Sequence, residues 1–296
     1  MPSRMLSGRI SRAASAAALA LGAGLAAPLL LAGTAGAAAP SATAALDGHA
    51  IAYTAAAQQT NKVAVTASRS GDDITYVIDD VVTISAGSGC SYPSAQDRTK
   101  VTCTVARLES QDPYATLQMS LGDRNDVVTY NNKTDQTYYF ASIDLGAGND
   151  TLTESGDVLG NGVRGGTGDD TLTVGAHTVV LGDEGDDTIH AGEGTIAQGG
   201  GGNDTINSKG DVDGGAGDDE IQGGAEGQSL TGGDGDDIIR GGAGNDFIYG
   251  GKGDDVLYGD EGDDTIYGNS GNDKLYGGPG KDTLSGGPGT NVVVQG

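Results

Sequence analysis

A nine-residue repeat occupies the C-terminal part of the chain and limits its possible folds more than any other feature. From Gly232 to Val294, seven units follow one another without a slip, each close to G-G-x-G-x-D-x-U-x, where U is a large aliphatic residue. The units are GGDGDDIIR, GGAGNDFIY, GGKGDDVLY, GDEGDDTIY, GNSGNDKLY, GGPGKDTLS and the degenerate GGPGTNVVV. A period of this kind is typical of solenoids, in which stacked units share one continuous core.

Earlier copies of the unit recur at about twice this interval. They begin at Leu145, Gly165, Gly182, Gly199 and Gly214, with apolar or small residues between them. Two units would make one coil of a flattened parallel solenoid, with a sheet on each side and coils stacked about 4.8 Å apart. The double spacing therefore predicts that one edge carries the repeated turn throughout, and that both edges carry it only after about residue 241.

The positions within a unit have distinct expected roles. The last three residues should form a short strand, in which position eight points to one face and positions seven and nine to the other. Position eight is always aliphatic and should form the core: Leu152, Leu172, Ile189, Ile206, Ile221, Ile239, Ile248, Leu257, Ile266, Leu275, Leu284 and Val293. The first six residues must turn the chain, and glycine at positions one, two and four permits positive φ and exposes backbone carbonyl groups.

The charge of the repeat region opposes a compact state. The whole chain has a net charge of −25, and residues 145–296 hold 29 acidic and 6 basic side chains. Self-repulsion of this size requires disorder, a basic partner or bound cations. A nucleic acid is excluded as a direct partner, because contacts to phosphates need a basic surface.

Stacking of the coils would place the aspartates at position six above one another. Ca²⁺ takes six to eight oxygen ligands, and two carboxylates together with exposed turn carbonyls could supply them. The absence of nitrogen and sulfur ligands disfavours zinc and copper. A pliable backbone cage also suits Ca²⁺ better than the smaller Mg²⁺.

These units resemble the RTX, or haemolysin-type, calcium-binding repeat family over about residues 145–296. The resemblance implies a right-handed parallel β-roll with Ca²⁺ held between turns, and folding driven by extracellular calcium. The gaps between turns on the same edge predict roughly 8–11 Ca²⁺ ions. It implies carboxylate ligands at position six: Asp150, Asp170, Asp187, Asp204, Asp219, Asp237, Asp246, Asp255, Asp264, Asp273 and Asp282. Asn291 takes this position in the last unit and should make a weaker site or none. Asp126, in the degenerate LGDRNDVVT, matches the position but is left out of the predicted ligand set.

The N-terminus has the features of an export signal. Residues 1–37 combine Arg4, Arg9 and Arg12 with an apolar stretch that ends in a small-residue cleavage motif near Ala37. A membrane anchor is the alternative interpretation of this stretch. No later segment is apolar and long enough to be expected to span a bilayer. We therefore expect a secreted, extracellular protein with a short flexible leader at residues 38–45.

Residues 46–144 predict a β-rich N-terminal domain. Apolar and polar residues alternate in five runs, which indicates strands: Val63 to Thr66, Ile74 to Ile78, Val81 to Ile84, Val101 to Val105 and Val127 to Tyr130. Ser70-Gly71-Asp72 separates two of the runs and predicts a hairpin. Cys90 and Cys103 are the two cysteines, and in an exported chain they should form a disulfide. The predicted fold is thus all-β, a cap followed by a β-roll over residues 145–296.

The alternatives differ in the sequence features they require. A disordered acidic linker would not conserve an aliphatic residue at position eight, and an EF-hand loop is absent. Tyr249, Tyr258, Tyr267 and Tyr276 recur at position nine and could stack in pairs 18 residues apart, or form a carbohydrate platform. An ice-binding solenoid would need a regular threonine column, which positions three and seven do not supply.

An enzyme is the main rival class, because such repeats often accompany hydrolases. No metalloprotease, nucleophile-elbow or P-loop motif occurs. His49, His177 and His190 are the three histidines: His177 and His190, in the repeat region, are expected to be surface residues, and His49 stands alone near the expected mature N-terminus. The sequence therefore favours a non-catalytic calcium-binding protein. An adhesin that binds a cell-surface or glycan partner through residues 46–144 is the alternative, and an accessory module of a hydrolase is less favoured.

Overall fold

The computed structural model describes residues 41–106, 114–134, 139–156 and 160–296. All 25 elements assigned in these ranges are β-strands, and residues 40–296 form one compact unit. The predicted signal segment, residues 1–37, and its cleavage position lie outside the described residues. Within the described ranges, no helix has the length and apolar character that a membrane crossing requires.

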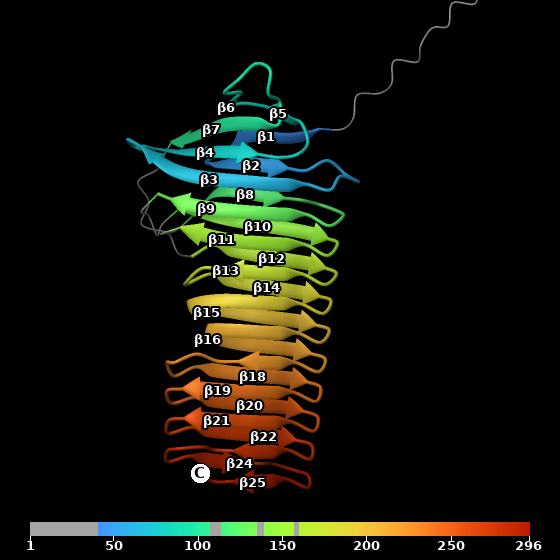
Figure 1. The fold of residues 1–296 in the computed structure, drawn as a ribbon, viewed down its shortest axis with the longest axis vertical. Helices are drawn as coiled ribbons and strands as arrows, with labels where there is room; N and C mark the ends of the chain where they lie inside the picture. Colours follow the sequence, from blue (N-terminus) through green and yellow to red (C-terminus); the bar gives the residue numbers. More distant parts are fainter. Residues whose placement is uncertain (1–40, 107–113, 135–138, 157–159) are drawn as a thin grey trace, which may run out of the picture. The chain divides into compact units, whose positions relative to one another are not determined.

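Seven strands form the N-terminal cap (Figure 1). They are β1 (Ala42–Asp47), β2 (Ala50–Thr54), β3 (Lys62–Ser70), β4 (Asp73–Asp79), β5 (Ile84–Ala86), β6 (Cys90–Ser91) and β7 (Lys100–Ala106). Antiparallel pairs join β1 to β2, β3 to β4 and β4 to β7. The predicted hairpin is confirmed, because Ser70 pairs with Asp73 across the turn that Gly71 and Asp72 form.

The cap differs from the sequence-based expectation in two places. Residues 42–45 belong to strand β1 rather than to a flexible leader, and Ala42 and Ala44 are fully buried, because alternate side chains of a strand point to the same face. The predicted strand from Val81 to Ile84 is also wrong for its first residues. The Asp80 carboxylate accepts a hydrogen bond from the Val81 N–H and ends the strand, which leaves Val81 62% exposed.

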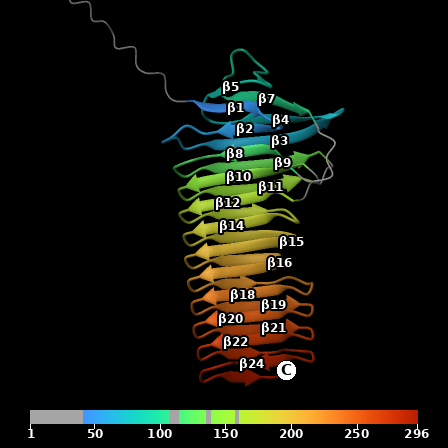
Figure 2. The ribbon, with the colours of Figure 1, turned by 180° about the vertical axis from the view of Figure 1, so that it is seen from behind.

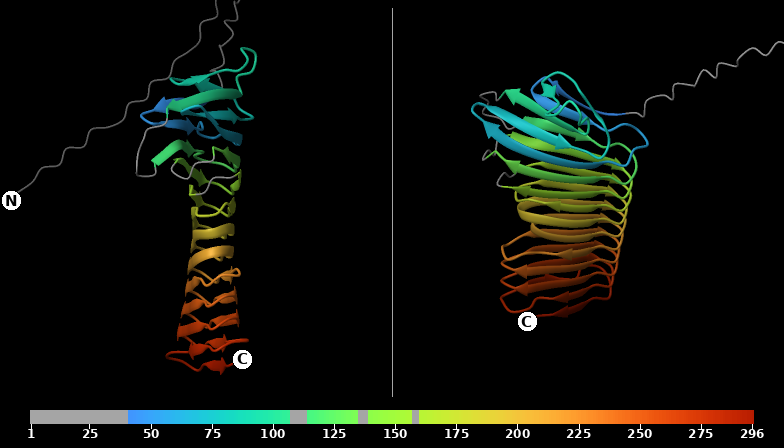
Figure 3. Two further views of the ribbon diagram at one scale, coloured as in Figure 1. Left: turned by 90° about the vertical axis from the view of Figure 1, so that its left-hand side faces the viewer. Right: turned by 45° about the horizontal axis from the view of Figure 1, so that its top comes forward.

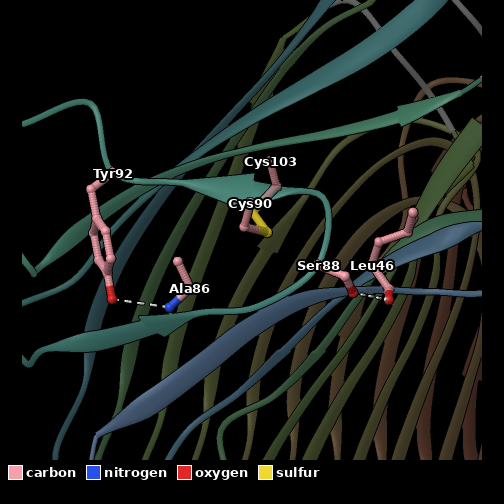
Figure 4. Close-up of a disulfide and its surroundings, with 6 residues drawn as sticks. All are labelled: Leu46, Ala86, Ser88, Cys90, Tyr92 and Cys103. Carbon is pink, nitrogen blue, oxygen red and sulfur yellow. Dashed lines mark hydrogen bonds between the residues drawn. A yellow bond between two sulfur atoms is a disulfide. The ribbon is translucent and has the colours of Figure 1, made fainter.

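The predicted disulfide joins β6 to β7. Cys90 and Cys103 lie opposite each other in an antiparallel pair, and Cys103 is fully buried (Figure 4). The segment between them is held further by the Tyr92 hydroxyl, which accepts a hydrogen bond from the Ala86 N–H. The disulfide therefore fastens the outermost strands of the cap.

The β-roll follows directly from the cap (Figures 1 and 2). Its first strands are β8 (Tyr114–Ser120), β9 (Val127–Lys133), β10 (Tyr139–Ala147), β11 (Thr151–Gly156), β12 (Gly162–Thr167), β13 (Thr171–Val174), β14 (Val179–Glu184), β15 (Thr188–Gly201) and β16 (Thr205–Ala216). The rest are β17 (Glu220–Gln222), β18 (Ser229–Asp234), β19 (Ile238–Ala243), β20 (Phe247–Lys252), β21 (Val256–Glu261), β22 (Thr265–Ser270), β23 (Lys274–Tyr276), β24 (Thr283–Ser285) and β25 (Val292–Val294).

Two parallel ladders run the length of the roll. One joins β3 to β9, β11, β13, β15, β16, β17, β19, β21, β23 and β25, and the other joins β2 to β8, β10, β12, β14, β15, β16, β18, β20, β22 and β24. The ladders thus begin with cap strands, so parallel stacking extends upstream of the boundary predicted at Leu145. In Figure 3 the coils appear as a flattened stack with strands on two sides.

The core of the roll is the predicted column at position eight. From Leu152 to Leu275, these side chains are almost completely buried between the two ladders. The prediction is wrong for the last member, since Leu284 is only partly buried and Val293 is 48% exposed. Strands 18 residues apart pair in register in the C-terminal coils, as for Ile239 with Leu257. The prediction that two nine-residue units make one coil is therefore confirmed.

The position-nine tyrosines stack as predicted. The ring centroids are 5.4 Å apart for Tyr249 and Tyr267 and 5.0 Å apart for Tyr258 and Tyr276, with the planes within 14°. The Arg240 guanidinium carbon lies 4.0 Å from the centroid of the Tyr258 ring, on the ladder β19–β21–β23. The rings therefore turn their faces to one another along the roll, which favours stiffening of the sheet over a platform of exposed ring faces.

Candidate metal centre

One edge of the roll carries a column of position-six side chains from the cap to the last coil. It lies at the right-hand edge in Figure 1, where turns follow β10, β12, β14, β16, β18, β20 and β22. The backbone N–H of each aspartate donates to Oδ1 of the next member, at distances of 2.7–3.1 Å. The members in order are Asp126, Asp150, Asp170, Asp187, Asp204, Asp219, Asp237, Asp255, Asp273 and Asn291.

The opposite edge carries a shorter column. Asp246 donates its N–H to Oδ1 of Asp264, and Asp264 donates to Oδ1 of Asp282, at 2.9 and 3.1 Å. Upstream of Asp246, the turns of this edge hold neutral side chains at the corresponding place, including Thr195 and Gln228. The sequence-based prediction of one complete and one partial aspartate edge is thus confirmed for the positions of these side chains.

Every aspartate in the two columns has one unsatisfied oxygen. Oδ1 is paired as described, whereas Oδ2 is buried and has no hydrogen-bond partner among the described residues. The set comprises all eleven predicted ligands together with Asp126. Buried polar atoms are otherwise paired in native proteins, and an unsatisfied carboxylate oxygen carries an especially large desolvation cost. A regular row of such oxygen atoms indicates that cations bind in these turns.

Glycine at position one leaves the space that these oxygens face. At Gly250, a Cβ atom would overlap Oδ2 of Asp255 and would also lie 2.8 Å from the carbonyl oxygen of Gly268, one coil further on. The same pair of oxygens surrounds the corresponding glycine in other units, such as Gly165, Gly199 and Gly232. Each turn therefore directs a carboxylate oxygen and a backbone carbonyl oxygen toward one small space.

The expected role of glycine at position one needs correction. Glycines at positions two and four have positive φ, as at Gly251 (123°) and Gly253 (131°), but Gly250 does not. Position one therefore requires glycine because of crowding by oxygen atoms and not because of backbone conformation. Position two is not restricted to glycine, since Asp183 and Asp260 adopt φ of 77° and 67° there.

Burial raises the pKa of most aspartates in the two columns. Desolvation raises the pKa of Asp170, Asp204, Asp237 and Asp255 to about 7, and neighbouring column aspartates add to the rise. The pKa values of Asp150, Asp187, Asp219 and Asp246 rise to about 6 for the same first reason. The pKa values of Asp264 and Asp273 are also raised by desolvation. Negative charge in these turns is thus costly without a counterion.

Asp126 is a column member that the sequence-based ligand set omitted. It is 1% exposed, and desolvation raises its pKa to about 7. Its Oδ1 accepts a hydrogen bond from the N–H of Asn61, whose fully buried side chain precedes it in the column. The signal was present in LGDRND, but Arg124 replaces glycine at position four of that unit.

A second row of side chains, at position five, was not foreseen. In this row the side-chain Oδ1 accepts a hydrogen bond from the backbone N–H of the next coil, as from Asp236 N–H to Asp218 and from Asp254 N–H to Asp236. These residues are exposed, unlike those at position six. The adjacent D-D or N-D pair found in most units thus forms two hydrogen-bonded ladders that point in opposite directions along the roll.

The donor set of the turns fits Ca²⁺. The position-six carboxylates and the position-one carbonyls are hard oxygen donors, which Ca²⁺ prefers. In the described part of the chain, no three His, Cys, Asp or Glu side chains gather at one point. Acidic side chains are instead distributed along the edges, one per turn, so a cation would be held by two coils together. His177 and His190 are exposed, as expected, His49 is exposed too, and none of the three belongs to either column.

Comparison with known proteins supports this assignment of the turns. The RTX calcium-binding nonapeptide repeat family matches the chain at residues 163–178, 179–195, 196–213, 210–226, 231–266 and 258–293. No curated protein matches the chain. The matched segments contain most of both aspartate columns, whereas Asp126 and Asp150 lie upstream of them.

Proposed function

Because this chain carries RTX calcium-binding nonapeptide repeats within residues 163–293, we propose that it is a secreted protein that folds as Ca²⁺ fills its turns. The observation that carries the proposal is the row of buried, unpartnered Oδ2 atoms, one in each turn of both columns. Calcium would supply the positive charge that these carboxylates lack and would join each coil to the next.

The stoichiometry follows from the gaps between neighbouring aspartates. Asp126 to Asp273 and Asp246 to Asp282 enclose about ten such gaps, and a divalent ion in each would contact the carboxylates on both sides of the gap. This number lies within the range of roughly 8–11 ions expected from the sequence. Asp150, Asp170, Asp187, Asp204, Asp219, Asp237, Asp246, Asp255, Asp264, Asp273 and Asp282 are the proposed ligands, and Asp126 is added to them.

The chain would be unfolded before export and would fold after it. The basic and apolar features of residues 1–37 support secretion, and Ca²⁺ is scarce inside cells and abundant outside. Repulsion among the acidic side chains would keep the repeats expanded before export. Binding of the metal would then provide the folding free energy, coil by coil, as in other repeat proteins with nearest-neighbour coupling.

A structural, non-catalytic role fits the described residues best. The most regular features of the roll are its buried, unpartnered carboxylate oxygens and its stacked core, and the exposed histidines belong to neither. The adhesin alternative, through residues 46–144, remains a prediction that binding to cell-wall or glycan material would test.

Equilibrium dialysis of the purified chain against Ca²⁺, with Mg²⁺ as the matched control, tests the proposal. We expect about ten Ca²⁺ ions per chain at saturation and no comparable uptake of Mg²⁺. Binding of fewer than two Ca²⁺ ions, or equal binding of both metals, would contradict it.

A further inference from the structure

At one end of each aspartate column, the unit has an amide side chain at position six instead of a carboxylate. The unit GGAEGQSLT (Gly223 to Thr231) places Gln228 there, immediately before the shorter column begins. The N–H of Gln228 donates to Oδ1 of Asp246 at 2.9 Å, so Gln228 is the first member of that column. Asn291 is the last member of the longer column, because its Oδ1 accepts a 2.7 Å hydrogen bond from the Asp273 N–H.

Both polar atoms of the Gln228 side chain are satisfied within the protein. Oε1 accepts a hydrogen bond from the N–H of Gly224, in the turn of its own unit. Nε2 donates to the carbonyl oxygens of Gly210 and Ser208, at 2.5 and 3.3 Å, in the preceding coil. The side chain is 4% exposed. The amide group therefore connects two successive coils at a buried turn without any further partner.

Asn291, the last member of the longer column, also has a side-chain amide that donates to a backbone carbonyl oxygen. Its Nδ2 donates to the carbonyl oxygen of Gly287 at 3.0 Å, within the same turn. A Cβ at Gly286 would overlap this amide group, just as a Cβ at other position-one glycines would overlap the aspartate Oδ2. The N–H₂ group of Asn291 thus occupies the place of the unpartnered carboxylate oxygen and meets a carbonyl oxygen directly.

The amide turns differ from the aspartate turns in the side-chain group that faces the backbone carbonyl oxygens. Asp255 presents an unpartnered oxygen there, which needs a cation, whereas the two amides present hydrogen-bond donors. An amide N–H₂ offers two donors, so it can satisfy the oxygens that a bound ion would otherwise coordinate.

We propose that Gln228 and Asn291 stand in for a bound Ca²⁺ ion and set where the two columns of calcium sites begin and end. This inference rests on the proposed function, since it assigns the limits of the sites that calcium fills. It also explains why the second edge, upstream of Asp246, needs no metal to join its turns: Gln228 and Thr195 make hydrogen bonds to carbonyl oxygens of the preceding coil.

The substitution Gln228→Asp should create a calcium site. It would place a carboxylate near Asp246 and remove the donors that now meet the Gly210 carbonyl oxygen. Asn291→Asp should do the same beside Asp273. Gln228→Asn is the matched control for the first change, because asparagine and aspartate have the same size and differ in charge. The original chain is the matched control for the second.

The experiment counts bound Ca²⁺ in each folded variant by equilibrium dialysis, with far-UV circular dichroism to check folding. We expect one additional ion for Gln228→Asp, one for Asn291→Asp and two for the double variant, with no gain for Gln228→Asn. In EGTA, both aspartate variants should lose more strand signal than the original chain. If Gln228→Asp does not fold in Ca²⁺, the Asn291→Asp variant decides.

The possible outcomes separate this inference from the function it builds on. If the original chain binds about ten ions and the folded aspartate variants bind no more, the stand-in role is wrong while the calcium-binding function stands. If the original chain binds no Ca²⁺, the proposed function itself fails. An equal gain for Gln228→Asn would also overturn the inference, because that variant adds no charge.

Discussion

The backbone N–H of Asp237 donates a 3.0 Å hydrogen bond to Oδ1 of Asp255, one coil further along the roll. This bond holds the two carboxylates close together, and the remaining oxygen of each is buried without a partner. The stacking that orders the turns therefore also creates a repulsion that a bound cation would relieve. The proposed coupling of folding to metal binding rests on this one relationship, repeated from coil to coil.

Removing one carboxylate should weaken calcium-dependent folding in the middle of the roll. Asp255→Asn keeps the Oδ1 acceptor but removes the charge from two neighbouring gaps. We expect at least one fewer bound ion and a loss of about 1–3 kcal/mol in the free energy of unfolding with calcium present. The measurement is the calcium midpoint for folding, followed by circular dichroism.

Asp254→Asn is the control for this change. Asp254 is the adjacent, exposed residue at position five, and asparagine already occupies that position in several units. We expect its calcium midpoint to stay near that of the original chain. Equal shifts for the two variants, or no shift for Asp255→Asn, would show that the position-six carboxylate is not a ligand.

The metal-free roll should become more stable as the pH falls. The folded pKa of Asp237 is about 7, above the ordinary 3.8 of an unfolded chain, because of desolvation. The folded state therefore binds protons more tightly, and the stability that protonation adds is lost as pH rises from about 4 through about 7. In EGTA, we expect more strand signal at pH 5 than at pH 8.

Calcium affinity should change with pH in the opposite direction. Protons compete with Ca²⁺ for the same carboxylates, so the calcium midpoint should rise when the pH falls from 8 to 5. A midpoint independent of pH over this range would mean that the buried aspartates do not ionise on binding.

Glycine at position one should be essential for the site. In Gly250→Ala, the new Cβ would overlap the Asp255 carboxylate and crowd the Gly268 carbonyl oxygen. We expect a loss of about 1–3 kcal/mol, the usual range for overpacking, and weaker calcium binding. Gly162→Ala is the control, since a Cβ there meets no atom within 4 Å. Similar calcium titrations for both variants would show that crowding by these oxygen atoms does not require glycine at position one.

The disulfide should stabilise the cap without affecting the calcium sites. Cys90 and Cys103 close a loop of 13 residues, and removing such a bond costs roughly 3 kcal/mol. In the Cys90→Ser, Cys103→Ser variant, we expect faster hydrogen exchange in β6 and β7 and unchanged exchange in β19 to β23. Loss of protection along the whole roll would show that the cap is required for folding of the coils.

The repeat region was predictable in detail because one physical constraint recurs in every unit. An aliphatic residue at position eight must be buried and an aspartate at position six must stack, so the core column, the coil size, the two edges and the tyrosine pairs followed from the spacing. The place of Gln228 in a column was not predicted, because its unit, GGAEGQSLT, lacks glycine at position four and aspartate at position six.

The cap was less predictable because its strands obey no period. Ala42 and Ala44 are core residues of a strand, but small side chains carry little strand signal, and a flexible leader was expected in their place. The boundary at Leu145 marked where the motif becomes regular, whereas parallel pairing already begins with β2 and β3. Asp126 lies in that irregular region, which is why its place in the column became clear only from its hydrogen bonds.

Far-UV circular dichroism of the purified chain, titrated with Ca²⁺ and then with EGTA at neutral pH, tests the dependence of the fold on metal most directly. We predict little strand signal before calcium, a cooperative gain as it is added, and loss of that gain when the chelator removes it. A full strand signal that persists in excess EGTA at pH 7.5 would contradict the proposal that stacked aspartates need a divalent cation between them.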